Sequence, residues 1–348
     1  MNIYCKNRSV RHHSAGRFLV TLAALALLAT GCRRSEPVQL YGEAQGTYYS
    51  VQYFDPQQRN LQPQIDSLLD AFDQSVSLWV DRSLLRCLNA GLTDSLDDIL
   101  LPLMTNSLAV EDYTDGAFNC RVGRLVQAWG FSFRQRQEPD SAELSLLLQS
   151  AHTHFDINNR RLVNKDPATE FDFNAIAQGY AADLVAQMLD RYGIESYLVD
   201  IGGEVIARGR KADGNPWRVG IERPAKDSLS APIVETTIPL VDRSVVTSGS
   251  YRKYYEKDGV KYSHTIDPAT GRPVTHSLLS VSVVEKECWL ADAMATAYMV
   301  MGLEKAKAFI ADHPQGFGTD AVFFIYDSCG TMASYATPGF EKMILQEK

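Results

Sequence analysis

Asp292 and Thr296 are the residues of this sequence whose types and spacing most directly suggest chemistry. They lie four positions apart at the start of an apolar helix, which we expect to follow an alternating strand at 278–285. Residues four apart share one face of a helix, so the carboxylate and the hydroxyl converge. Oxygen ligands suit Mg²⁺, which usually keeps positions open for water and substrate phosphates. The alternative is that Asp292 only caps the helix or interacts with its dipole, and the spacing alone leaves both interpretations open.

Three more segments are rich in polar residues and glycine and are therefore candidates for binding a ligand. The segment 114–119 (Thr-Asp-Gly-Ala-Phe-Asn) predicts a turn before an apolar helix, and a turn with a cap explains it as well as a binding role does. In 172–180, Gly179 interrupts a helical pattern at a cost of about 1 kcal/mol relative to Ala, which indicates close approach by another element or by a ligand. The amides, hydroxyls and guanidinium of 247–252 (Thr-Ser-Gly-Ser-Tyr-Arg) would suit a phosphate; the alternative is an ordinary β-turn.

His264 stands near the end of an expected strand and is followed by Asp267 and a turn at 270–271. Histidine acts as a base near neutral pH, and Asp267 would either orient it or cap the turn. A lone histidine is more often structural. Together with the Asp-x-x-x-Thr pattern 28 residues later, however, this one favours a site for phosphate chemistry.

The first 43 residues predict export and lipid anchoring. Residues 1–17 carry four basic and no acidic side chains, and 18–29 form a small and apolar run, which is the pattern of a secretory signal. The run is too short for a permanent membrane-spanning helix, which needs roughly 20 apolar residues. The small residues before Cys32 resemble a bacterial lipobox, in which the cysteine is diacylated; the alternative is an ordinary cleaved signal with a free Cys32.

These patterns predict a signal peptide at 1–31, a lipidated Cys32 with a tether at 32–43, and one functional domain at 44–348. The expected location is the bacterial cell envelope, lipid-anchored and facing the periplasm, with the choice of membrane left open. Removal of 1–31 leaves 30 basic against 42 acidic residues, a formal charge of −12, which argues against nucleic acid as a partner.

The cysteines after Cys32 lie at 87, 120, 288 and 329, a spacing that matches no zinc-binding pattern. Cys288, at the start of an apolar helix, is interpreted as a buried thiol. A disulfide is chemically possible in an exported protein, but the sequence does not pair these cysteines.

Strands and helices are mixed without strict βαβ order, and the sequence has no glycine-rich dinucleotide fingerprint. We therefore expect an α+β fold, a single compact unit with a largely antiparallel sheet and flanking helices. Asn174 is the expected cap of one helix and Gly193 its stop. Hydrophobic periodicity predicts helices at 61–79, 100–112, 122–129, 142–149, 175–192, 289–301 and 304–312. Alternation and turn signals predict a hairpin at 155–163 and strands at 47–54, 196–201, 204–208, 217–221, 233–239, 245–248, 251–256, 260–266, 278–285, 321–326 and 331–335.

Five groups of residues, in this order along the chain, carry a family resemblance. They are 83–89, 114–119 with 129–131, 172–183 with 201–203, 247–252 with 264–273, and 291–296. On these motifs the chain resembles the ApbE family of exported flavin transferases over nearly all of its mature length. The resemblance implies magnesium-dependent transfer of the FMN half of FAD to a threonine hydroxyl of an acceptor protein, with release of AMP. The acceptors it implies are exported subunits of sodium- or proton-linked redox pumps.

The resemblance also assigns roles to individual residues. It implies that the metal ligands are Asp292, Thr296 and the backbone carbonyl of Ala175, and that His264 deprotonates the attacking hydroxyl. The implied flavin contacts are Gln45, Trp79, Ala117, Phe118, Asn119, Asp172, Gln178 and Ile266.

Four of these positions depart from the commonest family pattern. Gln178 stands where Lys or Glu is often seen, Asn119 where Asp is frequent, Trp79 where Tyr is usual, and Gln45 where Met is common. A tryptophan still stacks on a flavin or adenine ring. The lost charges at 119 and 178 would alter affinity or shift the balance between transfer and hydrolysis. Two alternatives therefore stay open: a magnesium-dependent FAD pyrophosphatase that yields FMN and AMP, and a flavin-binding lipoprotein without chemistry.

Overall fold

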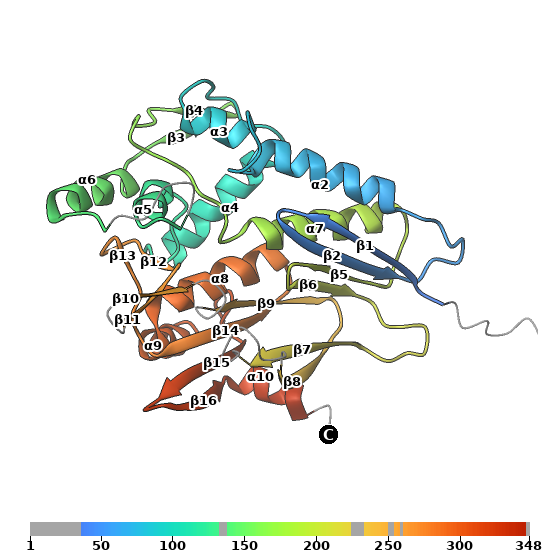
Figure 1. Cartoon of the computed structure of the whole chain (residues 1–348). Helices are drawn as coiled ribbons and strands as arrows, with labels where there is room; N and C mark the ends of the chain where they lie inside the picture. The colour runs from blue at the N-terminus through green and yellow to red at the C-terminus, as the bar shows by residue number, and fades with distance from the viewer. Residues whose placement is uncertain (1–35, 132–137, 224–232, 250–253, 258–259, 346–348) are drawn as a thin grey trace, which may run out of the picture. The chain divides into compact units, whose positions relative to one another are not determined.

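An eight-stranded sheet, in which every neighbouring pair of strands is antiparallel, is the centre of the computed structural model (Figure 1). The structure describes residues 36–131, 138–223, 233–249, 254–257 and 260–345, and Pro37–Lys348 form one compact unit. The strands cross the sheet in the order β1 (Val38–Ala44), β2 (Thr47–Tyr53), β5 (Tyr197–Ile201), β6 (Glu204–Arg208), β9 (Arg243–Gly249), β14 (Leu278–Glu285), β15 (Ala321–Ser328) and β16 (Thr331–Ala336). The expected α+β fold with an antiparallel sheet is confirmed.

The central strands of the sheet contribute side chains to a core on each face, because successive side chains along a strand point to opposite sides. Val246 of β9 and Val283 of β14 pack into the main core, whereas their neighbours Val245 and Val284 pack into a second core on the opposite face. The main core is covered by α2 (Gln62–Val76), α4 (Leu100–Tyr113), α7 (Ala177–Arg191), α8 (Cys288–Met301) and α9 (Leu303–Asp312). The second core is covered by the hairpin β7 (Trp217–Arg223) and β8 (Ile233–Leu240) with α10 (Pro338–Leu345), as Figure 1 shows.

A smaller third cluster lies away from the sheet. Its buried members include Leu125, Trp129, Leu144 and Ile266. They come from α5 (Gly123–Ala128) and the residue that follows it, from α6 (Ser141–Ala151), and from the two-residue strand β12 (Ile266–Asp267), which pairs with β13 (Arg272–Pro273). The remaining elements are α3 (Leu84–Asn89) and the hairpins β3–β4 (Asp156–Asn158, Arg161–Val163) and β10–β11 (Tyr254–Lys257, Val260–Ser263). The third cluster thus holds the segment that carries His264 and Ile266.

The expected tether at 32–43 is wrong in its second half. Residues 38–44 form β1, which pairs with β2 from Val38 opposite Tyr53 to Ala44 opposite Thr47. Gln45 and Gly46 join the two strands with φ of 55° and 72°, the positive values that a two-residue hairpin turn requires. The expected signal peptide and Cys32 lie outside the described residues.

The start of α7 and the C-terminal helix also differ from expectation. Helix α7 begins at Ala177 with Ile176 as its N-cap residue, so Asn174 does not cap it, whereas Gly193 ends it with φ of 74° as expected. Helix α10 was not expected from the sequence. Within the described residues, no helix combines the length and the apolar character that crossing a bilayer requires. Cys120 and Cys288 are buried free thiols, and Cys87 and Cys329 are also free.

Candidate active site

Helices α7 and α8 are in close contact at Gly179. A Cβ atom at this position would lie 2.5 Å from the carbonyl oxygen of Cys288 and 2.8 Å from the Cβ of Asp292. Only glycine therefore fits here without displacing the α8 backbone. The close approach expected from Gly179 is confirmed, and the partner is another helix.

Because the two helices are this close, the Asp292 side chain of α8 accepts a hydrogen bond from the backbone of α7. Its Oδ2 accepts from the Gly179 N–H at 3.1 Å, and its side chain is buried. In a regular helix the Gly179 N–H would donate to the carbonyl of Ala175 four residues earlier. Helix α7 begins at Ala177, so the Gly179 N–H lies in its first turn and takes its partner from α8, and no backbone N–H within the described residues donates to the Ala175 carbonyl. The Ala175 carbonyl, four residues before Gly179, therefore keeps its oxygen for another partner.

Thr296 extends the oxygen cluster by one turn of α8. Its Oγ1 lies 3.4 Å from the Ser248 Oγ on β9, and the neighbouring Thr247 Oγ1 lies 2.7 Å from the Ser282 Oγ on β14. Residues 247–249 belong to strand β9, so the β-turn alternative is wrong for this part of the 247–252 segment. Residues 250–252 lie outside the described residues. Ser248 thus points toward Thr296 on α8, whereas Thr247, the next residue along the strand, points to the opposite face of the sheet.

The donor set fits a hard divalent cation. Asp292, Thr296 and the Ala175 carbonyl offer only oxygen atoms, which is the chemistry that Mg²⁺ selects. Burial raises the pKa of Asp292 to about 7. In the described ranges no Lys, Arg or His forms an ion pair with this carboxylate, and no three His, Cys, Asp or Glu side chains gather as a metal site. The fit therefore rests on one buried carboxylate assisted by neutral oxygens.

Gln178 lies beside the turn between β5 and β6. Its Nε2 is 3.0 Å from the place that a Cβ on Gly202 would take, and the methyl group of Thr47 is 2.8 Å from the same point. Gly202 and Gly203 have φ of 67° and 112°. The amide of Gln178 is therefore held against the glycine turn, one residue from the Gly179–Asp292 contact.

Gln45 and Trp79 have the properties of ligand contacts. Both polar side-chain atoms of Gln45 are buried, and neither has a hydrogen-bond partner within the described residues, although its backbone N–H bonds to Asp73. Buried polar groups are normally paired, so such orphans point to a missing partner. Trp79 is 60% exposed in the loop after α2, where Ser77 Oγ accepts from its backbone N–H. An exposed indole of this kind is available for stacking on an aromatic ring.

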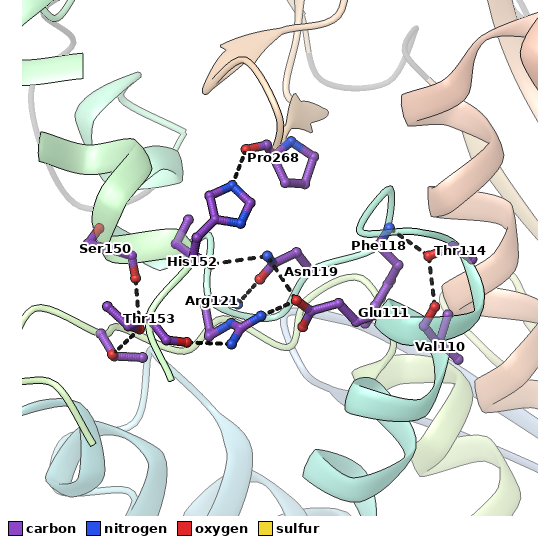
Figure 2. Close-up of polar contacts among 12 residues, drawn as sticks. Val110, Glu111, Thr114, Phe118, Asn119, Arg121, Ser150, His152, Thr153 and Pro268 are labelled. Carbon is purple, nitrogen blue, oxygen red and sulfur yellow. Dashed lines mark hydrogen bonds and ion pairs between the residues drawn. The ribbon is translucent and has the colours of Figure 1, made fainter. Parts of the chain in front are cut away.

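Phe118 and Asn119, in contrast, are occupied by internal contacts. Phe118 packs into the main core, and Ala117 beside it is half-buried. The Asn119 Nδ2 donates to the Ala151 carbonyl at 3.1 Å and its Oδ1 accepts from the Arg121 N–H at 2.7 Å. Figure 2 shows the Asn119 side chain next to Glu111 and Arg121, and its Nδ2 also donates to the Glu111 Oε1 at 3.4 Å. An aspartate could not donate to the Ala151 carbonyl, so asparagine at 119 has a local structural reason.

Asp172 connects the 114–120 loop with the start of α7. Its backbone N–H donates to the Cys120 carbonyl at 2.8 Å, and its Oδ1 accepts from the Asn174 N–H at 2.8 Å. Burial raises the pKa of Asp172. The loop that carries Ala117 is therefore fixed next to the segment that carries Ala175.

His264 and Ile266 belong to a segment that the third cluster anchors. Ile266 is buried there, and His264, two residues earlier, is half-buried. The Trp129 Nε1–H donates to the Gly271 carbonyl at 2.7 Å, and His152 Nε2–H donates to the Pro268 carbonyl at 3.1 Å (Figure 2). These two bonds fix the turn between β12 and β13. The role of His264 as a base stays a prediction.

Sequence reasoning missed two residues that organise this region. Ser248 was noted only as part of a phosphate candidate, and Asp183 only as the end of a motif. The Asp183 carboxylate accepts from the backbone N–H groups of Cys288 and Trp289 at 2.9 and 2.8 Å. Its position four residues after Gly179 is the one sequence signal that could have placed it at the same interface.

Comparisons with known proteins show which family the chain resembles in sequence and fold. The model of the ApbE family matches residues 45–322. An FAD:protein FMN transferase of Vibrio cholerae is 37% identical over 302 residues, covering 84% of this chain and 89% of the relative. One of Escherichia coli is 34% identical over 351 residues, covering 94% and 98%. The apo crystal structure of Pseudomonas stutzeri flavinyl transferase ApbE matches with a TM-score of 0.79 at 32% identity, covering 89% of this chain and 97% of that one. The chain belongs to the ApbE family.

Proposed function

We propose that this chain transfers the FMN part of FAD to a threonine hydroxyl of an exported acceptor protein in a magnesium-dependent reaction that releases AMP. The transferase activity is that of the family and of the relatives that cover most of the chain. The magnesium dependence rests on one observation above all. The buried Asp292 carboxylate accepts from the Gly179 N–H, and no backbone N–H of the described residues donates to the Ala175 carbonyl, which supports the proposal that both oxygens serve as ligands.

In this reaction the acceptor oxygen forms a bond to the FMN phosphorus, and the bond from that phosphorus to the bridging oxygen breaks. AMP leaves with the bridging oxygen. Asp292, Thr296 and the Ala175 carbonyl would hold Mg²⁺, which supplies neutralisation of the charge that develops on the diphosphate oxygens. The same three residues fix the place where the diphosphate has to lie.

The flavin dinucleotide would be bound by the residues to which the family resemblance assigns flavin contacts. Gln45 offers a buried amide in need of a partner, Trp79 an exposed ring, and Gln178 an amide beside the Gly202 turn. Ala117, Phe118, Asn119, Asp172 and Ile266 complete the proposed contacts. Because the side chains of Phe118 and Asn119 are occupied internally, we assign the contacts of these two residues to their backbone atoms.

His264 would take the proton from the attacking threonine hydroxyl. General base catalysis of this kind typically contributes about 10²- to 10⁴-fold in rate. The anchored turn after Ile266 keeps the backbone of this segment in place, as a positioned base requires.

We further propose that the chain is lipidated at Cys32 and held in the bacterial cell envelope with its folded domain facing the periplasm. The basic N-terminus, the short apolar run and the small residues before Cys32 support this location. Exported subunits of redox pumps would then be within reach as acceptors. Metabolic labelling with a fatty acid, followed by the mass of the mature N-terminus, tests the anchor; an unmodified Cys32 would contradict it.

Asp292→Asn tests the reaction, because the amide keeps the volume of the side chain but removes the charge. Purified protein, FAD, Mg²⁺ and a candidate acceptor are incubated, and AMP release is followed together with the acceptor mass. We expect AMP release to fall by at least about a hundredfold, since charge stabilisation by a metal is worth several kcal/mol. Chelation of Mg²⁺ from the wild type should have the same effect.

The assay also separates the alternatives. An acceptor that gains the mass of FMN supports transfer, AMP with free FMN supports hydrolysis, and intact FAD supports binding alone. Release of AMP by Asp292→Asn at the wild-type rate would remove Asp292 from the mechanism.

A further inference from the structure

The start of α8 is capped by a residue from another helix. Helix α8 begins at Cys288, and its own N-cap residue, Glu287, makes no side-chain cap hydrogen bond. Asp183 of α7, 105 residues earlier, takes this place: Oδ1 accepts from the Cys288 N–H at 2.9 Å and Oδ2 from the Trp289 N–H at 2.8 Å. The carboxylate satisfies two of the amides that every helix start leaves unpaired, at the positive end of the helix dipole.

The contact is one half of a reciprocal pair. On α7, Gly179 and Asp183 are one turn apart; on α8, Cys288 and Asp292 are one turn apart. The Asp183 carboxylate of α7 accepts from the Cys288 N–H of α8. One turn away, the Asp292 carboxylate of α8 accepts from the Gly179 N–H of α7 at 3.1 Å. One such contact would fix the helices at a single point. Two contacts a turn apart also fix how far α8 slides along α7 and how it is rotated.

Stability alone does not explain this cap. Asp183 is only 5% exposed, and burying a carboxylate this deeply costs free energy even when it is hydrogen-bonded. A serine or an aspartate in place of Glu287 would cap α8 locally, without burial of a charge from another helix. What the Asp183 cap provides and a local cap does not is a link between α8 and α7.

We propose that Asp183 is a positioning residue of the metal site. It holds α8 against α7 in the register that brings the Asp292 carboxylate to the Gly179 amide and leaves the Ala175 carbonyl free. This inference rests on the proposed magnesium-dependent function, in which Asp292, Thr296 and Ala175 are the ligands. Asp183 contacts neither the metal nor the substrate and acts through the placement of α8.

Binding of Mn²⁺ to the purified full chain, without FAD and followed by the EPR signal of free Mn²⁺, tests the proposal. Asp183→Asn preserves the size of the side chain but turns an NH₂ group toward one of the two α8 amides. We expect the Kd for Mn²⁺ to rise by about 10- to 100-fold, the usual effect of losing a residue that orients a metal ligand.

Asp190→Asn is the matched control. Asp190 lies on the same helix and accepts from the Tyr197 hydroxyl at 2.8 Å, so this variant also loses a structural carboxylate. Its Kd for Mn²⁺ should stay within about twofold of the wild type, because no α8 amide depends on it. A loss of affinity equal to that of Asp183→Asn would mean that any weakening of α7 disturbs the site.

A double variant distinguishes positioning of α8 from simple capping of its first turn. It also keeps the test valid if Asp183→Asn alone folds poorly. Adding Glu287→Ser to Asp183→Asn supplies a local cap to α8. Positioning predicts that the double variant regains its Tm but not its Mn²⁺ affinity. Wild-type affinity in Asp183→Asn, or recovery of both properties in the double variant, would refute the proposal. A wild-type chain that fails to bind Mn²⁺ would instead refute the metal site of the proposed function.

Discussion

Replacing Gly179 with alanine is the smallest change that tests the contact between α7 and α8. The new Cβ would lie 2.5 Å from the Cys288 carbonyl oxygen, and real Cβ contacts are essentially never shorter than 3.0 Å. The obstacle is backbone, so it cannot rotate away, and the helices must separate by about 0.5 Å or more. The same displacement would lengthen the 3.1 Å bond between the Gly179 N–H and the Asp292 Oδ2 to about 3.6 Å, beyond hydrogen-bonding distance.

Two effects on stability oppose each other in this variant. Alanine gains about 1 kcal/mol over glycine as a helix former, whereas overpacking typically costs about 1 to 3 kcal/mol. We therefore expect a net loss of about 0 to 2 kcal/mol. The effect on the site is larger, because a released Gly179 N–H is free to bond to the Ala175 carbonyl. The Mg²⁺ concentration that gives half-maximal AMP release should rise about tenfold or more.

Gly193→Ala provides the control for stability. Gly193 ends α7 with φ of 74°, and a Cβ there would have no neighbour within 4 Å. Alanine at this position is strained by about 1 kcal/mol but touches nothing near the site. Its Mg²⁺ requirement should equal that of the wild type. If Gly179→Ala shows the same Mg²⁺ requirement as Gly193→Ala at similar Tm, the α7–α8 contact does not set the metal site.

Two further predictions concern the polar network of Figure 2. Arg121 and Glu111 form an ion pair with side chains only 13% and 15% exposed, so Arg121→Met should cost about 2 to 4 kcal/mol in urea denaturation. Adding Glu111→Leu should restore most of the lost unfolding free energy, because it removes the carboxylate left unpaired. A double variant as unstable as Arg121→Met would contradict the ion pair as the cause. His152→Phe removes the donor to the Pro268 carbonyl and should lower kcat for transfer while leaving the KM for FAD within about twofold. A changed KM with normal kcat would show that His152 serves flavin binding instead.

The sequence predicted the candidate metal ligands on α8 because both lie on one helix. The spacing of Asp292 and Thr296 defines their common face without any knowledge of the rest of the fold. The contacts that complete the site join residues 113 and 105 positions apart, Gly179 to Asp292 and Asp183 to Cys288. They depend on how two helices dock, which no local pattern encodes. A glycine at 179 predicted that another group approaches the helix closely, but the sequence did not identify that group as α8.

The errors at Asn174 and at β1 have separate physical causes. Asn174 is a good cap by residue type, but α7 begins at Ala177, and the Gly179 N–H of its first turn bonds to Asp292 of another helix instead of to a local cap. In β1, Leu40 is the only fully buried residue, so this edge strand carries no alternating apolar signal. Its register comes from the turn at 45–46 and from pairing with β2.

Helix α10 was missed for a third reason, because it begins with Pro338 and Gly339, which weaken a helical pattern. It forms because Phe340 is buried in the second core and because the Thr337 Oγ1 donates to the Asp320 carbonyl just before the helix. Tertiary contacts at both points outweigh the local preference.

The proposed reaction needs two groups that rest on different packing units. The metal candidates lie on α8 and just before α7, beside the main core, whereas His264 belongs to a segment held by the third cluster. The segment 114–122 joins the two units: Phe118 packs into the main core, and Val122 packs against the third cluster.

Within the same segment, Arg121 bonds to Glu111 on α4 and donates to the Thr153 carbonyl after α6 at 2.6 Å. A buried ion pair contributes little net stability compared with apolar packing, but it holds its partners in one geometry. Burial raises the pKa of Glu111, so keeping this carboxylate charged in the ion pair costs free energy. The ion pair is therefore better explained by the geometry it fixes between the main core and the third cluster than by its stability. In the proposed reaction, Glu111 and Arg121 would thus hold the segment of His264 in place relative to the candidate metal ligands.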